Sequence, residues 1–188
     1  MHMRGVEYRL EPDQRRIAVV GTSGAGKTTL CEAISQAKDI PYTEIDSLFH
    51  GPHWEPRAEF LDDVQAILNR DEWIIEWQYR LARPLITPRA QVFVWLDLPI
   101  GRRMARLTRR TVGRWRSGGE LWNGNREPGP SVWLKRCDDN ILWWGWKTRH
   151  KLDDLEDQLA SQYASGEAVV VRLASARQVR EWRRLNGL

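Results

Sequence analysis

Apolar and polar positions follow two distinct patterns along this 188-residue chain. Residues 17–20 are an uninterrupted apolar run, which is typical of a strand buried on both faces of a parallel sheet. In residues 27–38 the apolar side chains recur at intervals of three and four, which predicts a helix with one buried face. Further segments of both kinds follow. The pattern predicts strands at 17–20, 42–46, 72–76, 91–96 and 168–173, and helices at 27–38, 56–68, 97–111, 132–163 (mostly helical) and 177–185.

Strands that alternate with helices predict an α/β fold, here an open five-stranded parallel sheet with helices on both faces. The chain length suits a single domain over residues 1–188. Residues 1–14 are polar, and we expect them to form a frayed or edge segment. Residues 113–130 are rich in Gly, Asn, Pro and Arg. We therefore expect a mobile loop there, within a lid-like insertion at about residues 111–131.

Composition narrows the functional classes. The chain has no apolar run long enough to span a membrane, and its N-terminus lacks the apolar centre of a signal peptide, so we expect a cytoplasmic protein without a membrane partner. Cys31 and Cys137 form no metal-ligand or disulfide pattern, which favours reduced thiols.

Seven arginines and no acid lie between residues 102 and 116. Such a cluster binds phosphate groups, either of a nucleotide or of a polymer.

The sequence GTSGAGKTT, residues 21–29, follows the first strand and opens the first helix. It matches the phosphate-binding pattern G-x-x-x-x-G-K-[ST]. Glycines let backbone N–H groups turn inward, and the helix N-terminus points further donors at the same place. Lys27 would reach the β- and γ-phosphates, and the Thr28 hydroxyl would bind Mg²⁺. The residues predicted to hold ATP or another nucleoside triphosphate are Gly21, Ser23, Gly24, Ala25, Gly26, Lys27, Thr28 and Thr29. An ordinary glycine-rich strand–helix turn is the alternative interpretation.

Two acidic residues lie where predicted strands end. Ligands bind at the carboxyl edge of open α/β sheets, so both are candidates for the site. Asp46 could orient an acceptor hydroxyl or accept its proton, or it could cap a short helix together with Ser47. Glu76 could hold a Mg²⁺-bound water, or it could be a solvated surface acid.

Three other polar residues near the predicted strand ends have simpler interpretations. Asp97 precedes Leu98 and Pro99, so we expect it to be the N-cap of a helix. His50 and His53 flank a Gly-Pro pair, and no further ligand is spaced to complete a metal site with them. We expect these histidines to line a substrate site or to lie at the surface.

Three stretches resemble adenylate kinases. Residues 73–80, WIIEWQYR, have the layout of the family's D-G-x-P-R motif, with Glu76 at the acidic position and Arg80 at the arginine. Beyond the stretch D-L-P at residues 97–99, Arg106 and Arg110 fall where the family carries two phosphate-contacting arginines at the base of its lid. Residues 136–139, RCDD, resemble the lid-exit motif R-x-D-D. That resemblance implies that Arg136 is another phosphate ligand.

The combination is similar to a bacterial subgroup of adenylate kinase-related proteins known as topology modulation proteins. The resemblance spans about residues 17–182 and implies a fold like that of nucleoside monophosphate kinases. It is carried by IDSL at 45–48, Trp54, the strand that ends at Glu76, LDLP at 96–99 and, above all, ELWNGNRE at 120–127. Trp77 departs from both groups, which usually have glycine after the acid. An indole there would fill space near the substrate, which argues against AMP as the acceptor.

The sequence therefore predicts a Mg²⁺-dependent kinase that transfers the γ-phosphoryl group of ATP to a small acceptor, such as a nucleotide-like compound. Arg126 is the candidate for an arginine that enters the site when the lid closes. The predicted catalytic residues are Lys27, Asp46, Glu76, Arg106, Arg110, Arg126 and Arg136. The predicted acceptor-binding residues are Asp46, Trp54, Arg57 and Arg80, and the predicted metal-binding residues are Thr28 and Glu76.

Two other functions remain open at this stage. One is a nucleotide-gated nucleic-acid-binding protein, which the basic residues 102–116 and Trp115 would support. The other is a slow NTPase that serves as a regulatory or toxin module and has no acceptor.

Overall fold

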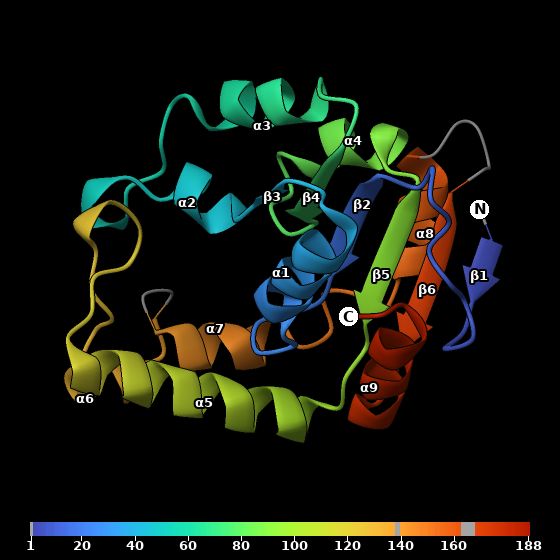
Figure 1. Cartoon of the computed structure of the whole chain (residues 1–188). Helices are drawn as coiled ribbons and strands as arrows, with labels where there is room; N and C mark the ends of the chain where they lie inside the picture. The colour runs from blue at the N-terminus through green and yellow to red at the C-terminus, as the bar shows by residue number, and fades with distance from the viewer. Residues whose placement is uncertain (1, 138–139, 163–167) are drawn as a thin grey trace.

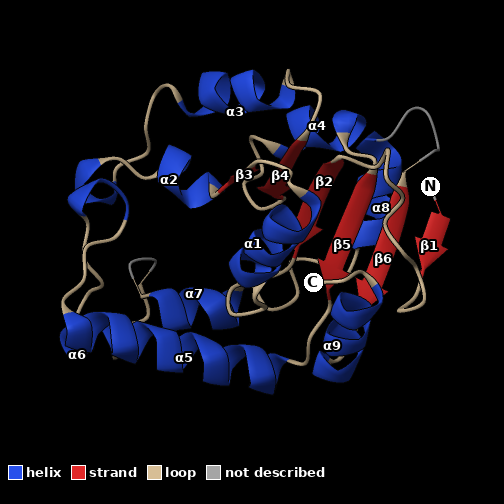
Figure 2. Ribbon diagram, in the orientation of Figure 1, coloured by secondary structure: helices blue, strands red, loops and turns tan. Residues whose placement is uncertain are grey.

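The computed structural model describes residues 2–137, 140–162 and 168–188. A parallel sheet lies at its centre, with helices on both faces (Figures 1 and 2), which confirms the predicted α/β architecture. The strands are β1 (His2–Arg4), β2 (Arg16–Val20), β3 (Tyr42–Thr43), β4 (Trp73–Glu76), β5 (Val92–Leu96) and β6 (Val169–Leu173).

The prediction of five strands is wrong, because the described residues form a sheet of six. The additional strand is β1, whose residue His2 pairs with Val169 in a parallel register. All three residues of β1 are exposed. An edge strand of this kind needs only backbone hydrogen bonds and no apolar side chains, so the hydrophobic pattern does not reveal it.

The strand order β1-β6-β5-β2-β4-β3 places β2 between β4 and β5. The chain therefore crosses from one side of β2 to the other, and the carboxyl end of β2 is the point at which the order reverses. Open α/β sheets bind their ligands at this point. Val19 of β2 is level with Glu76 of β4, and Val20 is level with Trp95 of β5, so the last residue of β4 lies beside the end of β2.

The helices agree with the predicted segments in some places and differ in others. The α-helices are α1 (Lys27–Lys38), α2 (Ile45–Phe49), α3 (Phe60–Leu68), α4 (Arg83–Ile86), α5 (Ile100–Ser117), α6 (Pro130–Trp133), α7 (Ile141–Lys147), α8 (Leu155–Gln162) and α9 (Ala176–Leu185). Short 3₁₀ turns are η1 (Pro52–Trp54), η2 (Thr87–Arg89) and η3 (Trp122–Gly124). Over the described ranges, no helix combines the length and the apolar character that a bilayer crossing requires.

α1 has the predicted bounds, but four other predictions need correction. The helix expected at 56–68 begins only at Phe60, because Pro56 pairs with His50 in an isolated antiparallel bridge. The strand expected at 42–46 ends at Thr43, because the backbone turns into α2 and the N–H of His50 bonds to the carbonyl of Asp46 at 3.0 Å. α5 continues to Ser117, into the region predicted as a loop. The segment 132–163 is divided among α6, α7 and α8 within its described part, and residues 138, 139 and 163 lie outside the described residues.

Two apolar clusters fill the core, one on each face of the sheet. Trp73 and Ile75 of β4 belong to the cluster beneath α3, α4 and α8, whereas Ile74 belongs to the cluster beneath α1 and α9. Figure 2 shows α1 and α9 on the near side of the sheet and α8 behind it. Because successive side chains of β4 point to opposite faces of the sheet, the position of a residue along β4 determines which of the two clusters its side chain enters.

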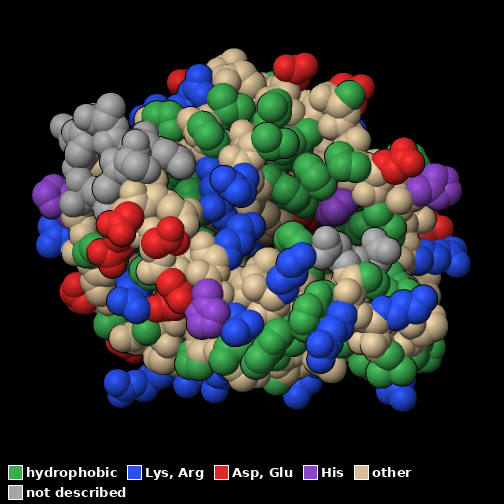
Figure 3. Space-filling view, turned by 180° about the vertical axis from the view of Figure 1, so that it is seen from behind, with side chains coloured by type: hydrophobic (Ala, Val, Ile, Leu, Met, Phe, Trp, Pro, Cys, Tyr) green, Lys and Arg blue, Asp and Glu red, His purple; other side chains and the backbone are tan. Residues whose placement is uncertain are grey.

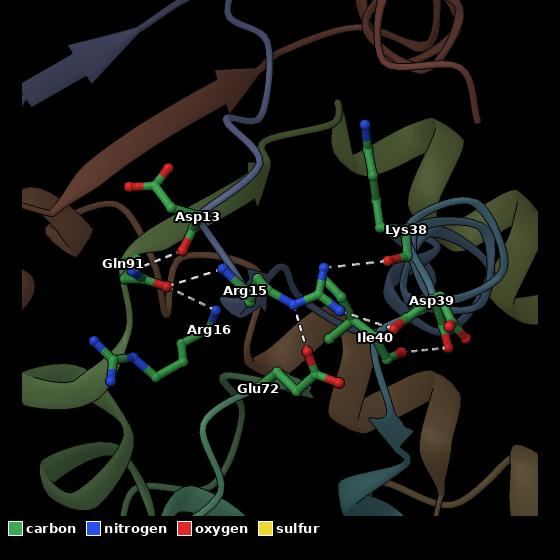
Figure 4. Close-up of polar contacts among 9 residues, drawn as sticks. Asp13, Arg15, Arg16, Lys38, Asp39, Ile40, Glu72 and Gln91 are labelled. Atoms are coloured by element: carbon green, nitrogen blue, oxygen red, sulfur yellow. Dashed lines mark hydrogen bonds and ion pairs between the residues drawn. The ribbon is translucent and has the colours of Figure 1, made fainter.

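Polar contacts connect the amino ends of the strands, at the edge away from the carboxyl end of β2 (Figure 4). The side-chain oxygen of Gln91 accepts the N–H groups of Arg15 and Arg16, each at 2.9 Å. The Arg15 guanidinium donates to Glu72 and, at 3.0 Å, to the carbonyl oxygen of Asp39 at the end of α1. These contacts satisfy backbone groups at the strand starts and hold β2, β4 and α1 together.

Candidate active site

The turn between β2 and α1 has a backbone that suits a bound phosphate. Gly24 and Gly26 have φ values of 79° and 98°, in the left-handed region that favours glycine. Within the described part of the chain, the N–H groups of Gly24, Gly26, Lys27 and Thr28 have no hydrogen-bond acceptor. Buried or half-buried amides normally have a partner. Together with the N-terminus of α1 these donors form a concave site that fits an anion.

A buried carboxylate faces this turn. Glu76 is 1% exposed and accepts a hydrogen bond from the Thr28 hydroxyl at 2.8 Å. Lys27 places its Nζ atom 3.9 Å from the other carboxylate oxygen. Tyr42 donates its hydroxyl to Glu76 at 3.3 Å, and burial together with the Glu76 charge raises the pKa of Tyr42. The sequence pattern predicted Lys27, Thr28 and Glu76 but not Tyr42, which begins the strand whose end was expected to carry Asp46.

The oxygen atoms of Thr28 and Glu76 fit a site for Mg²⁺. They lie within hydrogen-bond distance of each other and beside the free amides of the turn. Mg²⁺ prefers a few oxygen ligands together with water and substrate phosphates. The described residues contain no group of three or more His, Cys, Asp and Glu side chains that could hold a metal.

Arginines of α5 contact the same turn. Arg106 donates to the carbonyl oxygen of Ala25 at 3.2 Å, and its other terminal nitrogen would lie 3.0 Å from a Cβ atom added to Gly26. Arg103 donates to the Thr22 hydroxyl, and burial lowers the pKa of Arg103. Arg106 therefore lies against the turn, as does Arg103 one helical turn earlier, which the family motif did not indicate.

Arg110 lies one turn further along α5. Its pKa is lowered by desolvation and then by the charge of Arg114, while Glu127, Asp46 and Glu76 act in the opposite direction. Arg110 thus lies within the electrostatic reach of both candidate carboxylates, Asp46 and Glu76.

Asp46 lies in α2 and not at the end of a strand. The amide of Gln78 and the hydroxyl of Tyr79, at 2.6 Å, donate to the same Asp46 oxygen. The Tyr79 hydroxyl also lies 3.1 Å from Nε2 of His50. Burial and the Asp46 charge raise the pKa of Tyr79. Asp46 does not cap α2, whose start has no side-chain cap. Its carboxylate is therefore oriented by two residues that follow Glu76 in the chain.

The segment 118–129, which joins α5 to α6, reaches the α2–η1 region (Figure 1). Trp122 donates its indole N–H to Glu44 at 2.8 Å and stacks on His50, with ring centroids 5.8 Å apart and an interplanar angle of 22°. Burial raises the pKa of Glu44 and lowers the pKa of His50. The sequence motifs point to both segments but not to the contact between them.

Asn125 forms the central polar contact between these segments. It is 5% exposed, donates to the carbonyl oxygen of Gly51 at 2.8 Å and accepts the N–H of Trp54 at 3.0 Å. The amide of Asn123 donates to the carbonyl oxygen of His50. A short asparagine-rich turn therefore binds backbone groups of the η1 loop.

The four remaining candidate arginines, all among the described residues, do not contact the turn between β2 and α1. Arg57 pairs with Asp63 of α3 at 2.8 Å, and Arg80 is exposed. Arg126 pairs with Glu120 at 3.2 Å, and both side chains are largely exposed. Arg136 lies 5.4 Å from the ring centroid of a tryptophan in α7. The acidic residues 138–139 of the R-x-D-D stretch lie outside the described residues.

Two expectations at the strand ends are wrong. The Trp77 side chain is 1% exposed, belongs to the apolar cluster of Trp73 and Ile75, and donates its N–H to Thr87 at 2.9 Å. Because it continues the alternation along β4, its indole lies in the core and not in open space beside Glu76.

Asp97 does not cap α5, whose start has no side-chain cap. It accepts two hydrogen bonds from Arg172, at 2.6 and 2.9 Å. The neighbouring strand β6 supplies this partner, and local sequence does not reveal a partner so distant along the chain.

No protein-family model matches the chain, and no curated protein matches it in sequence. Solved structures do match. Shikimate kinase from Bacteroides thetaiotaomicron has a TM-score of 0.52 at 16% identity, covering 91% of this chain and 96% of that chain. Shikimate kinase from Acinetobacter baumannii, solved in complex with shikimate, has a TM-score of 0.50 at 14% identity, covering 91% and 90%. A gluconokinase from Sinorhizobium meliloti 1021 has a TM-score of 0.48 at 19% identity, covering 92% and 91%.

At these identities the likeness to shikimate kinases shows the fold alone. It agrees with the parallel sheet and the helices on both of its faces described above. The chain has the fold of a P-loop kinase.

Proposed function

We propose that this protein is a Mg²⁺-dependent kinase that binds ATP at residues 21–29 and phosphorylates a hydroxyl group of a small acceptor near Asp46. One observation supports this most strongly: the phosphate-binding turn, the buried Glu76 and the oriented Asp46 converge at the carboxyl edge of the sheet. Glu76 contacts Thr28 directly, and the charges of Asp46 and Glu76 both act on Arg110.

The residues of the turn would bind the triphosphate. The backbone N–H groups of Gly24, Gly26, Lys27 and Thr28 would donate to phosphate oxygens. The Lys27 side chain would exchange its contact with Glu76 for the β- and γ-phosphates. Arg106 and Arg110 would lie beside the transferred group and stabilise its charge. Mg²⁺, when bound, supplies positive charge to the β- and γ-phosphate oxygens. Thr28 would hold it directly, and Glu76 would hold it through water.

The nucleoside part of ATP would extend along α5. A groove of about 670 Å³ lies between α5 and α9 and begins beside Arg106. Its walls combine apolar side chains with arginines, which suits a base and a ribose. It is lined by Leu98, Arg102, Ala105, Arg106, Arg109, Ala176, Val179, Arg180 and Arg183.

Asp46 would act on the acceptor. Because Gln78 and Tyr79 hold one of its oxygens, the carboxylate is oriented in advance to bind the reacting hydroxyl and to take its proton. Trp54 and Arg80 would contribute to acceptor binding from the η1 loop and from the turn after β4. Arg57 would take part only if it released Asp63.

The segment 118–129 would act as a lid. Arg126 and Arg136 would then approach the phosphates in a nucleotide-bound arrangement, with Arg126 exchanging Glu120 for the nucleotide. We favour this kinase over a nucleic-acid binder, because Arg103 and Arg106 of the basic helix contact the phosphate-binding turn. A nucleoside monophosphate belongs among the acceptors to test, because Trp77 lies in the core.

The test is a screen for ADP formation with ATP and Mg²⁺ over nucleoside monophosphates, nucleosides, sugars and small acids, with the product identified by mass spectrometry. We expect one acceptor class to stimulate ADP formation and to gain one phosphoryl group. Lys27→Ala should abolish this turnover, and Lys38→Ala, at the other end of α1, should preserve it. Release of free phosphate with every compound would identify an NTPase, and full turnover by Lys27→Ala would refute the assignment.

A further inference from the structure

Positively charged side chains gather at the turn between β4 and α4, next to Asp46. Lys151 and Arg83 both donate to the carbonyl oxygen of Gln78, each at 3.4 Å. The side-chain amide of the same Gln78 donates to Asp46. Arg80 follows two residues later and is exposed. Figure 3 shows Lys and Arg side chains near the middle of the face that is hidden in Figure 1, beside a hollow.

These charges lack an acidic partner. Among the residues that the structure describes, no carboxylate lies within 4.0 Å of the charged nitrogens of Lys151, Arg80 or Arg83. Burial, followed by the charges of Arg83, Lys27 and Arg80, lowers the pKa of Lys151 to about 8. Burial, followed by the charge of Arg80, lowers the pKa of Arg83 to about 10, while the charge of Asp154 acts in the opposite direction. Positive charge therefore predominates at this turn, and none of the three side chains forms an ion pair with a described carboxylate.

Only one of the three charges has an evident structural role. Arg83 is 6% exposed, its guanidinium carbon lies 3.9 Å from the Trp77 ring centroid, and it donates to Gln158 at 2.9 Å. Lys151 has one long contact to a carbonyl group, and Arg80 extends from an exposed turn. Keeping like charges together in a half-buried place costs free energy, and an anionic ligand would offset that cost.

We propose that Lys151 and Arg80 form a subsite for an anionic group of the phosphoryl acceptor, a carboxylate or a phosphate, on the opposite side of Gln78 from Asp46. The inference rests on the proposed kinase function and narrows it. The acceptor carries a hydroxyl group that Asp46 binds and an acidic group that Lys151 binds. It is therefore a hydroxy acid or a phosphate monoester, and not a neutral sugar or nucleoside.

Kinetics with matched pairs of acceptors tests the chemical class. AMP and adenosine form one pair, and gluconate and glucose form another. Turnover should occur with an acidic member and fall at least about tenfold with its neutral counterpart. Lys151→Met should raise the KM of the acidic acceptor about 10- to 100-fold, because a charged hydrogen bond is lost, and should leave the KM of ATP unchanged. Lys38→Met, at the far end of α1, serves as the control for removing a lysine charge.

The pH dependence separates a binding role from a structural one. The wild-type KM for the acidic acceptor should rise above pH 8, as Lys151 loses its proton. Lys151→Arg should keep the affinity within a few-fold and remove this rise, because arginine stays charged over that range. Equal turnover of acidic and neutral acceptors, or an equal loss of ATP affinity in Lys151→Met, would overturn the inference.

A chemical-labelling experiment tests the subsite even if the kinase proposal fails. Acetic anhydride at limiting concentration should acetylate Lys151, and inorganic phosphate or acetate ion should slow that reaction relative to the labelling of Lys38. Protection by phosphate alone or by acetate alone would identify the preferred anion. Arg80→Met should abolish the protection. If neither ion protects Lys151, or if protection persists in Arg80→Met, the subsite does not exist, whatever the protein does with ATP.

Discussion

Replacing Gly24 with alanine tests how tightly the phosphate-binding turn is fitted against α5. A Cβ atom at this position would lie 2.3 Å from the carbonyl oxygen of Arg103 and 3.2 Å from Cβ of Leu107. The first contact is with backbone, so no side-chain rotation relieves it. Overpacking of this kind costs about 1–3 kcal/mol. A φ value of 79° adds about 1–2 kcal/mol for a residue with a Cβ atom. We therefore expect a destabilisation of about 2–5 kcal/mol.

Gly118→Ala is the matched control. Gly118 ends α5 with a φ value of 60°, and no atom lies within 4 Å of its added Cβ. The free energy of unfolding of Gly118→Ala should therefore fall only by the backbone contribution of about 1 kcal/mol. For a chain of this size, that corresponds to a loss of roughly 2–4 °C in thermal midpoint. Gly24→Ala should lose about 5–15 °C and at least about tenfold in MgATP affinity. Equal midpoints for the two variants, with nucleotide affinity intact in Gly24→Ala, would refute this account of the turn.

Three further predictions concern the contact between residues 118–129 and the η1 loop, and the proposed metal site. Asn125→Ala removes hydrogen bonds to the η1 loop, so amide hydrogen exchange of residues 120–126 should accelerate about 10- to 100-fold; unchanged exchange would show that these bonds do not hold the segment. Burial keeps the pKa of His50 below its usual value, so the contact of His50 with Trp122 is fully formed above pH 6.5 and should weaken as the pH falls below that. Amide hydrogen exchange of residues 120–126, corrected for the intrinsic rate, should therefore rise at pH 5.5 in the wild type but not in His50→Phe. A rise in both proteins would assign the effect to another group. Glu76→Gln should raise the Mg²⁺ concentration for half-maximal turnover about 10- to 100-fold, and no change would exclude a role for this carboxylate in metal binding.

The parts of the fold that depend on local sequence were predictable. The turn at 21–29 needs particular residues at fixed spacing, and α1 needs an amphipathic repeat, so both could be located from the sequence. Glu76 was predictable because it ends a buried strand, and parallel strands place their carboxyl ends at one edge.

The parts that depend on contacts between distant segments were not predictable. The orientation of Asp46 depends on Gln78 and Tyr79, and the periodic pattern does not show that these residues lie beside α2. The position of Lys151 depends on how the chain returns after α7. Its sequence surroundings are those of an ordinary solvated segment.

Trp77 shows how a motif can mislead. The glycine that usually occupies this position suggested that any side chain there would enter the substrate site. The alternation along β4 instead directs it into the core, where Thr87 accepts its N–H. At this position, the alternation of side chains along the strand predicts the direction of Trp77 better than the family motif does.

The most direct test of the central claim is calorimetric titration with the magnesium complex of a non-hydrolysable ATP analogue. We expect one binding site in the wild-type protein and a loss of about 100-fold or more in affinity for Lys27→Ala, with folding verified by circular dichroism. Absence of binding to the wild type, or binding of equal strength by a folded Lys27→Ala, would contradict the assignment of residues 21–29 as the triphosphate site.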